Sequence, residues 1–373
     1  MIIDIIRLVI ILTGLAVIPV LFYRFPILPK CSEAKKGEFP TVSVIIPARN
    51  EEKNLPLLLR DLCKQSVAPL EIICVDDESS DATAQIAAKY CSSVVSTPGK
   101  PEGWTGKSWA CHNGAAIASG RLLLFLDADV RLGRDGILRL LQAYSGHGCT
   151  ISVQPYHKTE RVYEQLSMLP NLIQIAANGT ALRNPKDVGL YGPVILIPEE
   201  DYRRAGGHES VRKCIVEDMA LGKRLRKVSL RFRNYIGDSE ISFRMYSDGL
   251  KSLLQGWIKN MASGALKTPP GIFTMVFFWI ASLISVPIRL IESVISGSVS
   301  RTLAYVLLYI AWVLILYILA NKAGRFRLYS FVLFPALIAV YLGIFAVSFY
   351  KKVFAVKVKW KGRTVAVEDK SCE

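Results

Sequence analysis

The sequence predicts an α/β protein with a mostly parallel sheet, helices on both faces of that sheet, and transmembrane helices at both ends of the chain. Between residues 40 and 250, short apolar runs alternate with helical patterns, which is typical of a parallel sheet. Long apolar blocks flank this region, and hydrophobic residues make up 51% of the chain, more than in an ordinary soluble protein. We therefore expect an α/β domain that is attached to a membrane.

The first strand and helix are expected at the start of this domain. Thr41–Ile46 is rich in β-branched residues, which favour a strand, and it ends at Pro47. Ala48–Glu52 then opens a helical segment that continues to Lys64. This order predicts a strand, a loop and a helix.

A second strand is expected at Glu71–Val75, where an apolar run ends at Asp76-Asp77. Ser80 or Asp81 then caps a helix over Ala82–Lys89, because a side-chain oxygen at that position accepts a hydrogen bond from the first turn. Asp77 is expected to accept a hydrogen bond from a base or ribose. The alternative is that it only caps the following helix.

Two more strands continue the pattern. Val94-Val95 is a strand candidate, and Ser108–Ser119 is a helix of small residues that Gly120 is expected to terminate. The Leu and Phe run within Arg121–Val130 is typical of a strand that is buried on both faces.

Asp127 and Asp129 lie at the carboxyl end of the strand expected within Arg121–Val130. Ligands of open α/β sheets bind outside these ends, and Mg²⁺ or Mn²⁺ is held by one or two carboxylates together with substrate phosphates. The pair is therefore a candidate metal site, with solvated acids at a strand end as the alternative. Asp77 reaches the same edge, so one acid can bind a nucleoside while the pair holds the metal on its diphosphate.

The loop from Gly99 to Ser108 carries Lys107 at the start of a helix. It is not a phosphate-binding loop of the Walker A type, because Pro101 stands where that pattern requires glycine. A lysine at a helix start still favours an anion, so Lys107 is expected to bind the substrate phosphates. A solvated loop lysine is the alternative.

Further along, Glu217-Asp218 precedes a helical pattern over Met219–Arg226. Acids in this position ordinarily cap the helix and interact with its dipole, which is the default interpretation from the local sequence. His208, in Gly206-Gly207-His208, is by the same reasoning expected to be structural.

The apolar blocks predict how the chain meets the membrane. Residues 1–25 are expected to form a retained anchor rather than a signal peptide, because no small-residue cleavage site precedes Phe22. Basic residues follow this anchor and place the domain 40–250 in the cytoplasm. Residues 272–350 are expected to cross the membrane two or three times. The apolar blocks of this region are Ile272–Ile288, Thr302–Ala320 and Tyr329–Phe349.

The basic tail, residues 351–373, favours an even number of crossings, which would keep this tail in the cytoplasm. In that case Ile272–Ile288, which is short and carries Pro287, would be a re-entrant or interfacial element. The net charge of +15 fits attraction to anionic lipids. Nucleic-acid binding is the lesser interpretation, because the domain has no compact basic cluster with interleaved aromatic residues. The eight cysteines have no Cys-x-x-Cys pair, so we expect reduced thiols and neither a zinc site nor a disulfide framework.

Taken in order, five motifs resemble the family 2 glycosyltransferases, which have the GT-A fold. The motifs are Val44–Glu52, Val75–Thr83, Gly106-Lys107, Leu126–Asp129 and Glu217-Asp218. The segment Phe243–Ala265 and the tail Val358–Arg363 further resemble the carotenoid-associated branch of this family.

The resemblance implies a metal-dependent, inverting transfer from a UDP-sugar. It implies that Asp127 and Asp129 hold Mg²⁺ or Mn²⁺ on the diphosphate, and that Asp218 is the catalytic base. The residues expected to bind the donor are Pro47, Glu51, Asp77, Lys107, Asp127 and Lys259.

The implied acceptor is a carotenoid carboxylic acid such as 4,4'-diaponeurosporenoate, a hydrophobic molecule that would reside in the bilayer. Polymer synthesis is not expected, because Gln255–Lys259 departs from the Gln-x-x-Arg-Trp motif of processive members. Glycosylation of a hopanoid, a glycerolipid or a polyprenyl phosphate is an alternative, as is a non-catalytic scaffold that binds sugar nucleotides. A membrane-bound nucleotidyltransferase is disfavoured, because no Gly-rich loop follows the first strand.

Two segments are expected at the membrane surface. Arg161–Ala177 is either an interfacial helix that guides the acceptor or a helix packed on the sheet. In the linker 251–271, Trp257 and Lys259 either anchor the chain at headgroup level or close over the diphosphate.

Overall fold

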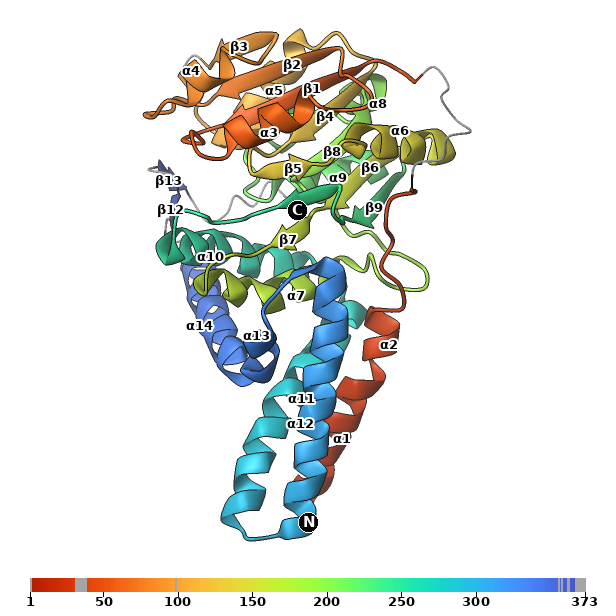
Figure 1. The fold of residues 1–373 in the computed structure, drawn as a ribbon, viewed down its shortest axis with the longest axis vertical. Coiled ribbons are helices and arrows are strands. Elements are labelled where there is room, and N and C mark those ends of the chain that lie inside the picture. The colour runs from red at the N-terminus through yellow and green to blue at the C-terminus, as the bar shows by residue number, and fades with distance from the viewer. Residues whose placement is uncertain are drawn as a thin grey trace. The chain divides into compact units, whose positions relative to one another are not determined.

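The computed structural model describes residues 2–30, 39–97, 99–354, 356, 358–360 and 363–365 (Figure 1). The chain forms two compact units. The membrane-helix unit contains Met1–Phe25, Thr159–Val188 and Tyr246–Tyr350, and the sheet unit contains Pro26–Lys158, Gly189–Met245 and Lys351–Glu373. The sheet unit therefore excludes residues 159–188, which lie inside the domain 40–250 that the sequence suggested.

A seven-stranded sheet organises the sheet unit, in the order β3-β2-β1-β4-β8-β6-β9. Only β8 is antiparallel to its neighbours in this sheet, which confirms the mostly parallel arrangement. The strands are β1 Val42–Ala48, β2 Glu71–Asp76, β3 Ser93–Ser96, β4 Leu122–Leu126, β6 Thr150–Gln154, β8 Val194–Pro198 and β9 Phe232–Ile236. A smaller set pairs β5 Val130–Leu132 with β10 Ile241–Phe243, and β10 with β7 Tyr156–Lys158.

The strand order creates a switch point between β1 and β4. The chain runs outward from β1 through β2 to β3 and then returns to β4 on the other side of β1. The connections on either side of such a point diverge, which leaves a crevice at the carboxyl ends of the strands where ligands bind. Pro47 near the end of β1 and Asp127 directly after β4 both lie at this crevice.

Helices cover both faces of the sheet, as the sequence predicted. Side chains alternate along β1, so Val44 and Ile46 pack with one set of helices while Ile45 packs with the other. Burial on both sides explains why the strands are continuous apolar runs. One face carries α3 Leu55–Leu62, α4 Thr83–Ala87 and α6 Gly136–His147, and the other carries α5 Gly106–Ile117, α8 Glu199–Arg204 and α9 Glu217–Lys227.

Three sequence expectations in this unit are wrong. The first helix begins at Leu55 rather than Ala48, because hydrogen bonds to the neighbouring β2–α4 loop hold residues 49–54 as a loop. Gly120 does not end α5; its N–H donates to Ser43 Oγ at 2.8 Å, and the close approach to β1 leaves no room for a side chain. Cys214 is disulfide-bonded, a pairing that sequence spacing alone does not reveal.

The membrane-helix unit contains four helices that are long and apolar enough to cross a membrane. They are α1 with α2, over Asp4–Leu21, α11 Pro270–Ile295, α12 Val299–Ala323 and α14 Phe334–Val353. α11 continues through Pro287 and is 26 residues long, so it is longer than the apolar block Ile272–Ile288. Charged side chains in its last two turns end the apolar run, so the sequence suggested a shorter element.

Close packing joins the first helix to α11. Gly14 lies against Ser282, where a side chain on residue 14 would come within 2.2 Å of the Ser282 Cβ. Ser282 Oγ also donates to the carbonyl oxygen of Ile11 at 3.2 Å. Small residues that let two backbones approach are typical of packed membrane helices.

Three further helices of this unit form a layer that we call the interfacial layer: the 3₁₀ helix η2 Tyr163–Ser167, α7 Met168–Asn178 and α10 Leu250–Lys267. α7 packs against α10, α11 and α12 and belongs to the membrane-helix unit. Trp257 of α10 is buried, and its Nε1 donates to Ser167 Oγ at 3.3 Å. It packs within the layer instead of anchoring at headgroup level.

Candidate active site

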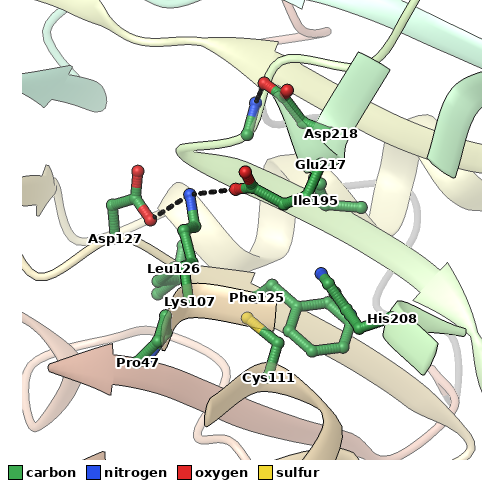
Figure 2. Close-up of a pocket in the computed structure, with 11 residues that line it drawn as sticks. Pro47, Lys107, Cys111, Phe125, Leu126, Asp127, Ile195, His208, Glu217 and Asp218 are labelled. Atoms are coloured by element: carbon green, nitrogen blue, oxygen red, sulfur yellow. Dashed lines mark hydrogen bonds and ion pairs between the residues drawn. The ribbon is translucent and has the colours of Figure 1, made fainter. Parts of the chain in front are cut away.

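A cluster of charged side chains lies at the switch point of the sheet (Figure 2). Lys107 Nζ is 2.7 Å from Asp127 Oδ1 and 3.2 Å from Glu217 Oε1. The three residues come from the start of α5, the end of β4 and the start of α9, which are far apart in the sequence. The fold thus brings together three motifs that the sequence presented separately.

The cluster lines an open pocket of about 250 Å³. This volume includes space that is open to solvent. The lining residues are Pro47, Lys107, Cys111, Phe125, Leu126, Asp127, Gly192, Ile195, His208, Glu217 and Asp218.

Backbone geometry aims Lys107 and Asp127 at this pocket. Thr105 caps α5 by accepting from the N–H of Ser108, which fixes the first turn that carries Lys107. The N–H of Asp127 donates to the carbonyl oxygen of Pro193 at 2.9 Å, so the residue that ends β4 is tied to the strand beside it. Both charged groups are therefore held by well-defined elements.

Asp218 lines the pocket from the start of α9, where it follows the buried Glu217 and is itself half-buried. Its Oδ2 accepts from the Gly192 N–H and its Oδ1 from the Met219 N–H, each at 2.8 Å. Burial, and then the neighbouring charge of Glu217, raise the pKa of Asp218 to about 6. A carboxyl group with this pKa exchanges a proton near neutral pH, as a general base or acid requires.

The charges of the pocket do not cancel. Burial opposes the charge of Lys107, yet the carboxylates of Asp127 and Glu217 hold its pKa well above its usual value. His208 is neutral, because burial lowers its pKa to about 4. Above pH 6, one ammonium therefore faces the carboxylates of Asp127, Glu217 and Asp218 among the lining residues.

A second acidic position lies beside the pocket, where two loops are tied together. Arg49 Nη1 donates to the carbonyl oxygens of Asp77 and, at 3.0 Å, Glu78. The Glu51 N–H donates to Thr83 Oγ1 at 2.8 Å. Asp77 itself is only 5% exposed. These contacts fix the loops after β1 and β2 relative to each other.

Four of the eight expected residues do not line the pocket: Glu51, Asp77, Asp129 and Lys259. Asp129 lies in the turn between β4 and β5 and is half-buried. Lys259 lies on α10, in the membrane-helix unit. Pro47, Lys107, Asp127 and Asp218 do line it, while Glu51 and Asp77 belong to the tied loops.

Three residues of the site carried no functional expectation from the sequence. Glu217 was interpreted as a helix cap, but it holds Lys107. Gly192 donates its N–H to Asp218, and a side chain there would come within 2.8 Å of Oδ2. The pair Gly189 and Gly192 was the available signal, because glycines before a strand mark close backbone approach. His208 is buried with Tyr202 Oη 3.0 Å from its Nδ1 and also lines the pocket.

Comparisons with known proteins agree with this geometry. Residues 43–200 match the family model described as Glycosyl transferase family 2. A protein of Staphylococcus haemolyticus named 4,4'-diaponeurosporenoate glycosyltransferase is 33% identical over 366 residues, which cover 95% of this chain and 97% of that protein. The protein of the same name from Staphylococcus aureus (strain USA300) is 35% identical over 335 residues, 87% of this chain and 88% of that protein.

Among solved structures, the mannosyltransferase PcManGT from Pyrobaculum calidifontis, in complex with GDP-Man and Mn²⁺, has the same fold. The TM-score is 0.54 at 14% identity, over 92% of this chain and 99% of that one. With the sheet order, the motifs and the relatives in agreement, the chain belongs to glycosyl transferase family 2 and is a glycosyltransferase of the GT-A fold.

Proposed function

We propose that the protein transfers a sugar, with inversion, from a UDP-sugar to a carotenoid carboxylic acid such as 4,4'-diaponeurosporenoate. The observation that carries the proposal is the cluster of Lys107, Asp127, Glu217 and Asp218 at the switch point of the sheet. The acceptor is supported by the two Staphylococcus relatives, whose name specifies it, and which match most of the chain.

The nucleoside would bind at the tied loops beside the pocket. Asp77 is proposed to accept a hydrogen bond from the uridine, with Pro47 and Glu51 shaping the loop after β1. Asp76 supports this location, because its Oδ1 is buried and has no hydrogen-bond partner within the described residues. Buried acceptors are normally satisfied, so a donor group on a ligand fits here.

The residues present fit a divalent cation that binds together with the diphosphate. The excess of carboxylates over ammonium in the pocket would repel an anionic diphosphate unless a cation accompanied it. No group of three or more His, Cys, Asp or Glu side chains in the described part of the chain could hold an ion alone. Asp127 and Asp129 would hold Mg²⁺ or Mn²⁺ with the phosphates, the usual arrangement for these ions. The ion would stabilise the negative charge of the departing UDP.

Lys107 and Asp218 would then act on opposite sides of the bond that breaks. The Lys107 ammonium would lie near the leaving diphosphate and offset its developing charge. Asp218 would face the acceptor, where a base removes the proton of an incoming hydroxyl. A carboxylic acid acceptor is already ionised near neutral pH, so for that acceptor Asp218 would orient the nucleophile rather than deprotonate it.

The membrane helices give this chemistry access to a hydrophobic acceptor. A long polyene partitions into the bilayer, so the enzyme must meet it at the membrane surface. We propose a multi-pass protein of the cell membrane with a cytoplasmic catalytic domain and with the interfacial layer beside the bilayer. Lys259 of α10 is also proposed to contribute to donor binding.

Purified full-length protein tests the proposal. With UDP-glucose and Mn²⁺, UDP release is expected only when vesicles contain 4,4'-diaponeurosporenoate, and mass spectrometry should detect the glycosylated acid. Release only with polyprenyl phosphate, diacylglycerol or a hopanoid would overturn the acceptor but keep the transferase. Donor binding without UDP release in any of these vesicles would instead support a scaffold.

A further inference from the structure

We propose that α13 Leu328–Val332 and α14 form a re-entrant hairpin, which enters the bilayer from the catalytic side and returns to that side. The chain would then cross the membrane three times, at α1, α11 and α12. α14 has the length and apolarity of a fourth span, so those two properties do not decide the question. The positions of its two ends within the membrane-helix unit do.

The carboxyl end of α12 lies at the interfacial layer. Asn171 Nδ2 of α7 donates to the carbonyl oxygen of Ala323, the last residue of α12, at 3.4 Å. Just beyond, the Arg327 N–H donates to Gln165 Oε1 of η2 at 2.9 Å. The hairpin therefore starts from this layer.

The carboxyl end of α14 returns to the same layer. Ser348 Oγ donates to the carbonyl oxygen of Ile258 at 2.6 Å and accepts from the Ala262 N–H at 3.0 Å, both in α10. One turn earlier, Ile344 packs with Trp257. Because α10 packs against α7, both ends of the hairpin meet one layer.

The tip of the hairpin stops part of the way along α12. The ring of Tyr309 in α12 is 4.9 Å from that of Phe334, the first residue of α14. At 1.5 Å per residue, Tyr309 lies about 21 Å before Ala323, and Phe334 lies about 21 Å before Ser348. α12 continues from Tyr309 for a further ~15 Å to Val299, so the tip does not reach its far end.

One backbone carbonyl oxygen at this tip is satisfied by a side chain of α12. Tyr309 Oη donates to the carbonyl oxygen of Val332, where α13 ends. A helix break inside a bilayer needs such an internal donor, because lipid tails offer none. The apolar side chains at the tip, Val332 at 45% and Leu333 at 54% exposure, suit contact with the acyl chains of one leaflet.

Charge supports the same topology independently. No Asp, Glu, Lys or Arg occurs in residues 328–350. Basic residues stand on both sides of this stretch: Lys322, Arg325 and Arg327 before it, and Lys351 and Lys352 after it. Basic flanks favour the cytoplasmic side, and a full crossing would place one of the two groups on the other side.

Labelling with a membrane-impermeant maleimide tests the proposal in the full-length chain. Three variants would each be placed in sealed vesicles of both orientations. They are Ser300→Cys at the start of α12, Leu333→Cys at the tip and Val353→Cys at the end of α14. Peptide mass spectrometry assigns each label, and the exposed native Cys63 marks the catalytic side. We expect Val353→Cys to react from the side of Cys63, Ser300→Cys from the opposite side, and Leu333→Cys only after detergent.

Reaction of Val353→Cys from the side of Ser300→Cys would overturn the re-entrant hairpin, as would reaction of Leu333→Cys in intact vesicles. Trypsin provides a measurement without substitutions. It should cut after Lys351 or Lys352 only from the side on which Cys63 is labelled, and cutting only from the other side would overturn the proposal. Neither readout needs donor or acceptor, so the result is separate from the proposed sugar transfer.

Discussion

Two strand ends in the sheet unit both present acids, but they hold them in different ways. After β2, Asp77 lies in a loop that hydrogen bonds tie to the loop after β1, through Arg49 and Thr83. After β4, the side chain of Asp127 pairs with the ammonium of Lys107, which Glu217 shares. Hydrogen bonds between the loops fix the first position, whereas the carboxylate at the second position is held by a balance of charges.

The difference suggests how the two positions divide the work. A fixed loop recognises a group that does not change during the reaction, such as a nucleoside, at little entropic cost. A balance of charges can rearrange when phosphates arrive and negative charge develops on them. Substitutions at the charged position should therefore affect the rate, and substitutions in the tied loops should affect donor affinity.

The largest effect is expected for Asp127→Asn and Asp129→Asn. Loss of either carboxylate removes a proposed ligand of the cation, and kcat/KM for UDP-glucose should fall by about 10³-fold, since such an ion contributes several kcal/mol. Calorimetry should show that Mn²⁺ no longer strengthens UDP-glucose binding. Glu200→Gln, an exposed acid of α8, is the control for lost charge. Unchanged metal-dependent affinity in both variants would refute the metal assignment.

Lys107→Met should have the next largest effect. We expect kcat to decrease about 10²-fold, because the leaving diphosphate loses a charged partner. Donor affinity should change less than kcat, as expected for a contact that strengthens in the transition state. Initial-rate kinetics at saturating Mn²⁺ measure both constants. Lys227→Gln, an exposed lysine at the end of α9, should behave as the unchanged chain. A rise in KM alone would assign Lys107 to ground-state binding.

Asp218→Asn should leave UDP-glucose binding intact and reveal the class of acceptor. With the carotenoid acid, the decrease in kcat should be about 10-fold, because the nucleophile needs no base; with a hydroxyl acceptor, 10²–10⁴-fold is typical. The same variant with each acceptor gives the comparison. Equal losses for both acceptors would contradict the orienting role.

The pH dependence should differ in the same way. The pKa of Asp218 is raised to about 6, so its carboxylate dominates above that pH and is lost below it. With a hydroxyl acceptor, kcat should therefore decrease about tenfold per pH unit below 6. With the carotenoid acid we expect a shallower decrease, and Asp218→Asn should remove the component that arises from this group. A steep limb that persists in the variant would assign it to another residue.

The smallest effect is expected for Thr83→Val, in the tied loops. It removes the oxygen that accepts from the Glu51 N–H and costs about one hydrogen bond, or roughly 1 kcal/mol. KM for UDP-glucose should increase about fivefold, with kcat unchanged. Thr302→Val in α12 is a matched control. A decrease in kcat instead would show that the tied loops also act on the chemical step.

Sequence reasoning predicted the fold class and four of the eleven lining residues, because both depend on local patterns. The run Leu122–Leu126 reports burial on both faces, and Asp127 follows it directly. It did not predict the ion pair of Lys107 with Glu217, because these residues are far apart in the sequence and only the fold brings the starts of α5 and α9 together. It also missed the length of α11, where Arg289 and Glu292 end the apolar run while the helix continues.

The contact between the first helix and α11 has a consequence for biosynthesis. Ile11 and Ser282 are joined by a hydrogen bond although they are 271 residues apart in the chain. At a synthesis rate of about 5–20 residues per second, the first helix waits roughly ten to fifty seconds in the bilayer before its partner leaves the ribosome. During that time Gly14 offers a backbone surface with no complementary helix. The ribosome therefore completes the whole catalytic domain before the helix pair that attaches it can assemble.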